Sequence, residues 1–283
     1  MLTHKIMNKL KFTALAVLLL SLFACKSQYE ILLSSNDVDA KYKAAMELFN
    51  DKKYQKAAQL FESMAVLTSG TARDDTVQYY WGLSNYRNKD YFTAESNFDR
   101  FVQNFPRSPF AADAAFYRLD CLYRATYRWE LDQLPTRTCM AHITEYMREN
   151  ADDDVHIEVC RKMLADLQDR LDRKDFEAGR QYYHMEQYPS ARIKLLNVLK
   201  TNANNNYRED VLYYTAMSSY HYARLSVWQK QKERYLVFVD DYLNFVGEYP
   251  ESHYRKELDG IYRQVQKILG KDGVAEDEKP NEK

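Results

Sequence analysis

The residue with the most specific chemistry in this chain is Cys25. Its thiol closes the run Leu22-Phe23-Ala24-Cys25, and a cysteine thiolate is a nucleophile that can take up an acyl group. Lys9 and Lys11 lie just before the apolar run from Phe12 to Leu20. A basic start, a short apolar run and a small residue before a cysteine are typical of a secretory signal that ends in a lipobox. We therefore predict that residues 1–24 are removed as a signal peptide and that Cys25 is acylated as the new first residue.

The same segment also predicts where in the cell envelope the protein is located. From Phe12 to Ala24 the apolar stretch is shorter than the roughly 20 residues that a membrane-spanning helix needs. A plain signal peptide is the alternative interpretation, because Phe23 is bulkier than the residue usually found two places before the cysteine. No aspartate follows Cys25 to suggest retention in the inner membrane. The segment resembles those of Gram-negative outer-membrane lipoproteins, so we expect residues 25–36 to form a lipidated tether on the periplasmic face.

The remaining thiols offer a second, weaker chemistry. In Cys139-x-x-His142 and His156-x-x-x-Cys160, helical spacing would place each thiol and imidazole on one face, as a zinc site requires. The alternative is that these are packed thiols and surface histidines, and we expect neither a metal nor a cofactor. With Cys121 the mature chain has three further thiols, which allow at most one internal disulfide in an oxidising compartment. Cys121 with Cys139 is one candidate pair, and three buried thiols are the alternative.

Enzyme chemistry and nucleic-acid binding are not indicated. The acidic pairs Asp74-Asp75 and Asp240-Asp241 are typical of solvated helix faces, whereas a glycosidase pair needs a cleft around it. The sequence contains no nucleotide-binding loop, nucleophile elbow or zinc-protease helix. A formal net charge of −1 provides no global field that would attract nucleic acid. We therefore predict a non-catalytic protein that does not bind nucleic acid.

Composition favours an all-α fold. The chain has only 7 glycines and 6 prolines, too few for a sheet protein with many tight hairpins. Charged residues make up 29% and hydrophobic residues 46%, a balance that suits amphipathic helices. The site-bearing residues would therefore be positioned by packed helices.

An internal repeat organises those helices. Tyr54, Tyr91, Tyr188 and Tyr235 are each followed, three and seven residues later, by small, aromatic or apolar residues that share one helical face. Gly82 and Gly179 lie nine residues before two of these tyrosines, where a small residue lets two helices approach closely. These offsets resemble the tetratricopeptide repeat, whose unit is a helical hairpin of about 34 residues. We expect an all-α solenoid of about five such hairpins with a C-terminal capping helix.

The expected boundaries follow from this register. Residues 37–150 would hold repeats 1–3, residues 151–270 would hold repeats 4–5 with the capping helix, and residues 271–283 would be a disordered polar tail. In the second half we predict these elements: a helix over 155–173, a hairpin over 176–199, helices over 210–225 and 235–249, and a closing helix over 254–269.

Four fragments carry a resemblance to a known family. They are Phe105-Pro106-Arg107-Ser108, Tyr249-Pro250-Glu251-Ser252, Asp132-Gln133 followed by Thr136, and Glu177-x-Gly179-x-x-Tyr182-Tyr183. In this order, behind the lipobox and along nearly the whole mature chain, they resemble the BamD family of outer-membrane protein assembly factors. The resemblance implies a non-catalytic lipoprotein subunit of the β-barrel assembly machinery, anchored in the outer membrane. Its implied partners are a BamA-like barrel core subunit, unfolded outer-membrane proteins and other lipoproteins of the machinery.

In that family the N-terminal hairpins are proposed to receive unfolded barrel segments, and the C-terminal hairpins dock the core subunit. The resemblance makes these residues candidates for the substrate groove: Tyr42, Tyr79, Tyr80, Asn85 and Tyr117. The alternative for each is packing between helices.

At the docking end, the candidates are Tyr213, Tyr220, His221 and Arg224. His221 stands where the better-known branch of the family has an arginine, and Arg224 is about one helical turn further on. A solvated surface arginine is the alternative for Arg224. The alternative function for the whole chain is a periplasmic repeat lipoprotein that scaffolds envelope or cell-wall enzymes.

Overall fold

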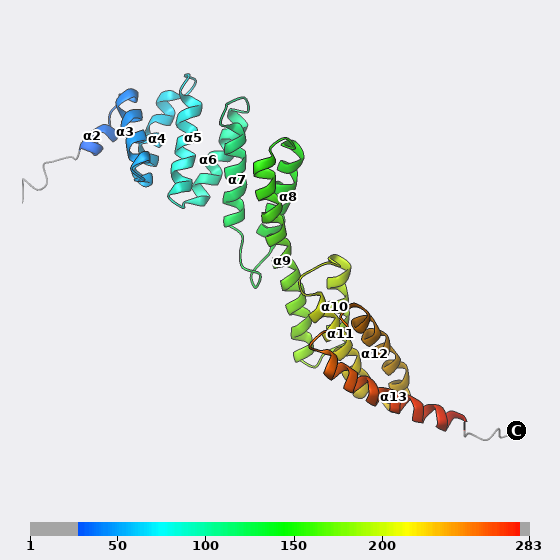
Figure 1. The fold of residues 1–283 in the computed structure, drawn as a ribbon. Helices are drawn as coiled ribbons and strands as arrows, with labels where there is room; N and C mark the ends of the chain where they lie inside the picture. The colour runs from blue at the N-terminus through cyan, green and yellow to red at the C-terminus, as the bar shows by residue number, and fades with distance from the viewer. Residues whose placement is uncertain (1–27, 278–283) are drawn as a thin grey trace, which may run out of the picture. The chain divides into compact units, whose positions relative to one another are not determined.

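The computed structural model describes residues 28–277, and these residues form only helices (Figure 1). This confirms the predicted all-α class. The predicted signal peptide and Cys25 lie outside the described residues, as do residues 278–283. Between residues 28 and 277, none of the helices is both long and apolar enough to cross a bilayer. The helices are α2 (Gln28–Leu33), α3 (Val38–Asn50), α4 (Tyr54–Thr68), α5 (Asp74–Arg87), α6 (Tyr91–Asn104), α7 (Ala111–Arg124), α8 (Leu134–Glu149), α9 (Asp154–His184), α10 (Tyr188–Thr201), α11 (Arg208–Arg224), α12 (Trp228–Glu248) and α13 (Arg255–Asp277).

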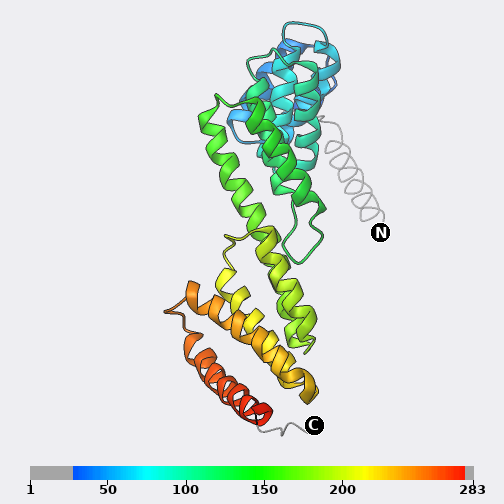
Figure 2. The ribbon, with the colours of Figure 1, turned by 90° about the vertical axis from the view of Figure 1, so that its right-hand side faces the viewer.

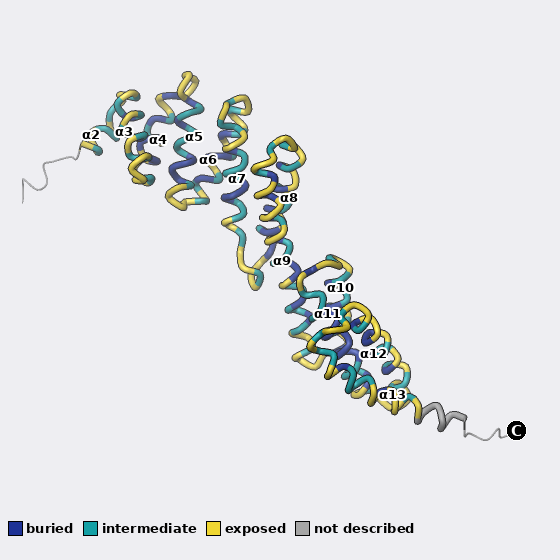
Figure 3. Tube along the Cα trace, in the orientation of Figure 1, coloured by how far each residue is buried: buried dark blue, intermediate teal, exposed yellow. Residues whose placement is uncertain are grey.

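The helices form two compact units, each with its own core (Figures 1 and 2). The described part of the first unit comprises residues 28–126 and 141–156, and that of the second comprises residues 127–140 and 157–277. In the first unit α3 to α7 pack each on the next, and in the second unit α10 to α13 do the same. Along most helices buried and exposed residues alternate (Figure 3), as amphipathic helices require. The predicted boundary between residues 150 and 151 stays a prediction.

The turns between α3 and α4, α5 and α6, and α9 and α10 share one backbone conformation. Lys52, Lys89 and Glu186 have φ values of 61°, 65° and 58°, in the left-handed region, and each lies two residues before the tyrosine that begins the next helix. Non-glycine residues adopt this conformation at a cost of about 1–2 kcal/mol. In these three hairpins the repeat register thus predicts not only the helices but also where the chain reverses.

The two repeat glycines lie where helices meet most closely. A Cβ built on Gly82 would be 3.0 Å from Cε1 of Phe98, and one on Gly179 would be 2.7 Å from Cδ2 of Leu195. Phe98 and Leu195 are fully buried. Glycine at these two positions therefore allows α5 to pack on α6 and α9 on α10.

Two predicted helix boundaries were wrong. The helix predicted over 155–173 continues without a break into the first arm of the hairpin predicted over 176–199. Together they form α9, because no glycine or proline interrupts residues 155–178. The helix predicted over 235–249 is α12 and begins at Trp228 rather than Tyr235, since the polar segment before Tyr235 contains no helix breaker.

The two ends of the described chain also differ from prediction. Within the predicted tether, α2 packs on the first hairpin, and Tyr29 Oη donates to Gln59 Oε1 at 2.8 Å. Buried Lys41 fixes the end of α2, because its Nζ donates to the carbonyl of Leu33 and to Ser63 Oγ, both at 3.0 Å. At the other end α13 continues to Asp277, beyond the predicted end of the capping helix.

Candidate functional site

Two of the predicted groove residues lie in the core of the first unit. Tyr79 is 6% exposed and stacks on Phe110 with ring centroids 4.5 Å apart. Burial is the main reason that the pKa of Tyr79 is raised above its usual range. Asn85 is 7% exposed, and its Nδ2 donates to Asn97 Oδ1 at 2.9 Å. Both side chains therefore hold helices together in this structure.

The other three groove candidates are half-buried aromatic rings. Tyr80 stacks on Phe61 at 5.8 Å, and Tyr42 meets the same ring edge-on at 6.3 Å. Tyr117 stacks on Phe98 at 5.5 Å. The structure thus gathers Tyr42 and Tyr80 around one buried phenylalanine and places Tyr117 against another. Their remaining exposed edges are what a ligand could contact.

An open pocket of about 490 Å³ lies in the first unit, and α7, the helix that carries Tyr117, lines part of it. Its walls come from the Pro106–Pro109 junction, from α7 and from residues 142–150. Alanines on α7 leave the space, and Arg118, His142, Glu145 and Glu149 place both signs of charge around it. Arg118 is partly neutralised, because its Nε lies 2.9 Å from Asp99 and 3.2 Å from Glu95. An apolar floor with charged walls suits an extended polypeptide rather than a small reactive substrate.

This pocket was not predicted from the sequence. The signal that could have revealed it is the run Ala111-Ala112-Asp113-Ala114-Ala115, which puts small side chains on the faces of one helix where larger ones would fill a groove. The opposite wall of the pocket comes from residues 142–150, about 30 residues further along the chain. The spacing of residue types in the sequence does not reveal that contact.

Of the residues considered as zinc ligands, His156 is engaged with other side chains. His156 stacks on Phe116 with centroids 4.0 Å apart, and its Nδ1 lies 2.6 Å from Asp153 Oδ2. Burial raises the pKa of Asp153, but hydrogen bonds from His156 and Tyr146 outweigh it, so that the pKa is lowered overall. Across residues 28–277 no three His, Cys, Asp or Glu side chains are grouped as a metal site would need.

The three cysteines of the described chain are buried thiols. Burial, followed by the nearby charge of Asp120, raises the pKa of the Cys121 thiol to about 12. Such a thiol stays protonated at neutral pH and is a poor nucleophile.

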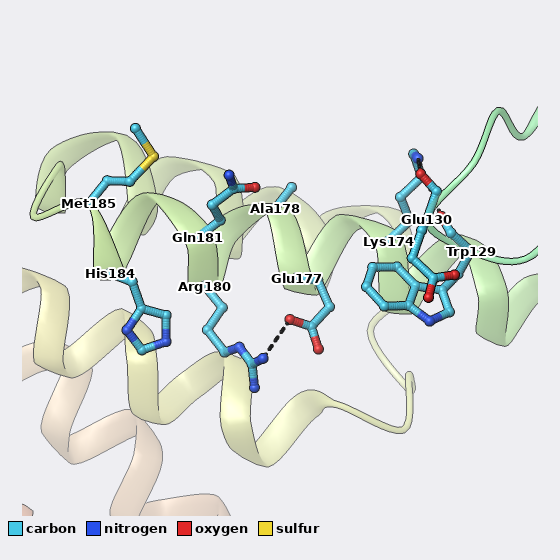
Figure 4. Close-up of a pocket in the computed structure, with 9 residues that line it drawn as sticks. All are labelled: Trp129, Glu130, Lys174, Glu177, Ala178, Arg180, Gln181, His184 and Met185. Atoms are coloured by element: carbon cyan, nitrogen blue, oxygen red, sulfur yellow. Dashed lines mark hydrogen bonds and ion pairs between the residues drawn. The ribbon is translucent and has the colours of Figure 1, made fainter.

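A second pocket of about 460 Å³ lies in the second unit, on one side of α9 (Figure 4). Lys174 at its edge is occupied, because its Nζ donates to the carbonyls of Trp129, Glu130 and Leu131 at 3.3, 3.2 and 2.8 Å. Arg180 pairs with Glu177 at 2.9 Å, as the dashed line in Figure 4 shows. Lys174 and Arg180 are therefore already paired and are not available to bind an anion. The contacts at this pocket attach residues 129–131 to α9.

The predicted docking residues lie on α11. Tyr213 is buried, stacks on Tyr254 at 3.8 Å and donates from its hydroxyl to Glu257 Oε2 at 3.0 Å. Tyr220 packs on Phe238 at 5.6 Å. Both rings therefore belong to the core of the second unit, with Tyr220 nearer its edge.

His221 and Arg224 lie at the end of the same helix. His221 stacks on Tyr188 at 4.9 Å, and its buried Nδ1 has no hydrogen-bond partner within the described chain. Burial, and then the charge of Arg224, lower the pKa of His221. Arg224 is exposed, with its guanidinium 6.0 Å from the centroid of the Tyr220 ring. Of the four docking candidates, Arg224 is the one that presents its charge to solvent.

Comparison with known proteins identifies one family, and two of the distantly similar solved structures are given with it. The model of the family YfiO, described as an outer membrane lipoprotein, matches residues 34–234. The TPR2AB domain of yeast Sti1 is 12% identical with a TM-score of 0.39, over 81% of this chain and 98% of that one. A TPR-repeat protein of Bacteroides fragilis is 16% identical with a TM-score of 0.39, over 83% and 100%. No curated protein matches the chain.

Proposed function

The chain belongs to the YfiO family of outer-membrane lipoproteins, and we propose that it is a non-catalytic adaptor subunit of the machinery that inserts β-barrel proteins into the outer membrane. The observation that carries the proposal is the extent of the family match. It runs over residues 34–234, which include α3 to α11 and the start of α12. The proposal includes acylation of Cys25 and a position on the periplasmic face.

In the proposed division of labour, the first unit binds segments of unfolded barrel proteins. Its pocket between the Pro106–Pro109 junction and residues 142–150 offers an apolar floor and charges of both signs. An extended segment presents alternating side chains and unpaired backbone groups, which such a surface can accept. The half-exposed edges of Tyr42, Tyr80 and Tyr117 would extend the contact, whereas Tyr79 and Asn85 would hold the helices that form it.

The second unit would bind the BamA-like core subunit through the end of α11. Exposed Arg224 is the contact that we favour, because a charge at the rim of an interface guides association and register. Tyr213, Tyr220 and His221 would support it from the core. Other lipoproteins of the machinery are further proposed partners.

Mild detergent extraction followed by capture of the full chain tests the assembly. We expect the barrel core subunit to be recovered with the wild-type chain and to be reduced by Arg224→Glu. Arg161→Glu, at another exposed arginine, on α9, serves as the matched control and should leave recovery unchanged. Absence of the core subunit from the wild-type capture would overturn the proposal. Recovery of cell-wall enzymes instead would support the scaffold alternative.

A further inference from the structure

The turn between α11 and α12 exposes three large apolar side chains in close succession. Leu225, Val227 and Trp228 are 63%, 66% and 78% exposed. Single exposed apolar residues are common on soluble proteins, but a contiguous group indicates a surface that is covered in use. With Lys230 and Arg234 we call these residues the turn patch.

The turn patch is held rigidly. Nε2 of Gln231 donates to the carbonyls of Arg224 and Ser226 at 3.2 and 3.0 Å, which ties the start of α12 to the end of α11. Ser226 Oγ donates to the carbonyl of Tyr222 at 2.5 Å. The exposed side chains therefore project from a fixed backbone, and little conformational entropy would be lost when a partner covers them.

Positive charge surrounds the apolar residues. Residues 224–234 contain four basic side chains and one acidic one, in a chain whose net charge is −1. The two arginines have neutral neighbours, since Arg224 lies over the Tyr220 ring, and Arg234 donates to Ser226 Oγ and lies 4.0 Å from the centroid of the Tyr222 ring. Lys230 is paired with Glu233, but both side chains are largely exposed, so that the pair is weak. The turn patch is thus a locally cationic site.

We propose that the turn patch binds the surface of a bilayer that contains anionic phospholipids. In this arrangement Trp228 lies at headgroup depth, where tryptophan is enriched in membrane proteins. Leu225 and Val227 enter the boundary with the acyl chains, and Lys230 and Arg234 contact phosphates. The patch would be a second membrane contact, separate from Cys25. The inference needs only the outer-membrane location of the family and not the proposed assembly function.

The favoured occupant follows from the order of the side chains. A cluster of aliphatic residues, a tryptophan and flanking cations on one short turn matches the layers of a membrane interface, in which apolar, amphipathic and charged zones follow one another. An acidic protein partner is the competing occupant, and the experiment below separates the two.

The test measures how deep Trp228 lies. The chain contains three tryptophans, so Trp81→Phe with Trp129→Phe leaves Trp228 as the only one. The mature protein isolated from the envelope is mixed with vesicles of phosphatidylcholine, with or without phosphatidylglycerol, whose acyl chains carry bromine. We expect bromine to quench Trp228 with phosphatidylglycerol at low salt, and much less with phosphatidylcholine alone or at high salt. The readout is the position of one side chain, so it holds whether or not Cys25 is acylated.

Two variants sharpen the result. Lys230→Gln with Arg234→Gln removes two cations, each of which should weaken interaction with the anionic surface roughly fivefold. For the control, Phe92→Trp is combined with substitution of all three tryptophans by phenylalanine, because Phe92 is 86% exposed on α6 beside acidic residues. We expect no quenching at position 92.

Several outcomes would overturn the proposal. These are an unquenched Trp228, equal quenching at positions 92 and 228, or quenching that is insensitive to salt and to the charge variant. Shielding of Trp228 only after addition of the purified barrel core subunit would also overturn it and would assign the turn patch to a protein interface.

Discussion

Single side-chain volumes control how closely the helices of one hairpin approach, and Gly179 is the sharpest case. We expect Gly179→Ala to destabilise the protein by about 1 kcal/mol, because overpacking against buried Leu195 exceeds the gain in helix propensity. Gly260→Ala is the matched control, since a Cβ there meets nothing within 4 Å, and it should stabilise by about 0.5–1 kcal/mol. Urea midpoints of the two variants check the pair. Equal stabilisation by both alanines would show that α9 and α10 are less closely packed than described.

At the scale of elements, the non-glycine residue in the left-handed conformation at the turn of three hairpins lowers the stability of the protein. Lys89 has a φ of 65° between α5 and α6, and a glycine adopts this conformation without strain. We expect Lys89→Gly to stabilise the protein by about 0.5–1 kcal/mol after the larger loss of chain entropy is included.

The control for this turn is Glu62→Gly, an exposed substitution in the middle of α4, which should destabilise by about 0.5–1 kcal/mol. Thermal unfolding of both variants gives the comparison. A destabilising Lys89→Gly would mean that the lysine side chain contributes contacts that outweigh its backbone strain.

The start of a helix could be predicted from the sequence where a residue type has only one structural role at that position. Tyrosine at a fixed offset from a turn predicted the starts of α4, α6 and α10, because the left-handed turn residue always precedes it by two positions. Tyr235 misled the prediction of α12, since a tyrosine inside a helix carries the same periodicity as one at its start.

The candidate site was harder to predict for a similar reason. Tyr79 and Asn85 have the helical spacing of a surface as well as of a core, and only packing on Phe110 and Asn97 decides that they are buried. The pocket that the structure shows depends on alanines and on a wall from distant sequence, which periodicity does not connect. The exposed turn patch likewise lay mostly between the two helices predicted over 210–225 and 235–249.

At the scale of the whole molecule, the abundance of tyrosine has a consequence for pH. Many of the hydroxyls donate to carboxylates: Tyr86 to Asp120, Tyr207 to Asp169, Tyr213 to Glu257, Tyr242 to Asp259 and Tyr254 to Asp210. These pairs occur in both units. Each one keeps a neutral phenol beside a negative charge, an arrangement that ionisation of the phenol would turn into repulsion.

We therefore expect both units to lose stability at alkaline pH. Burial, and then the hydrogen bond to Asp259, raise the pKa of Tyr242 to about 12, and burial with Asp169 raises that of Tyr207 to about 12. A tyrosine in the unfolded chain titrates near 10. Above pH 10 the unfolded state releases protons that the folded state retains, so the stability present below pH 10 is lost progressively as the pH rises through 12.

Urea midpoints measured from pH 8 to pH 12, with tyrosinate absorbance followed in parallel, check this expectation. Tyr242→Phe is the informative variant, because it keeps the ring that stacks on Tyr262 at 4.2 Å and leaves Asp259 paired with Arg255 at 3.0 Å. Its stability should fall less steeply above pH 10 than that of the wild type. A wild-type midpoint that stays constant to pH 12 would show that the phenols ionise as freely in the folded protein as in the unfolded chain, and that the tyrosine–carboxylate pairs do not stabilise the two cores.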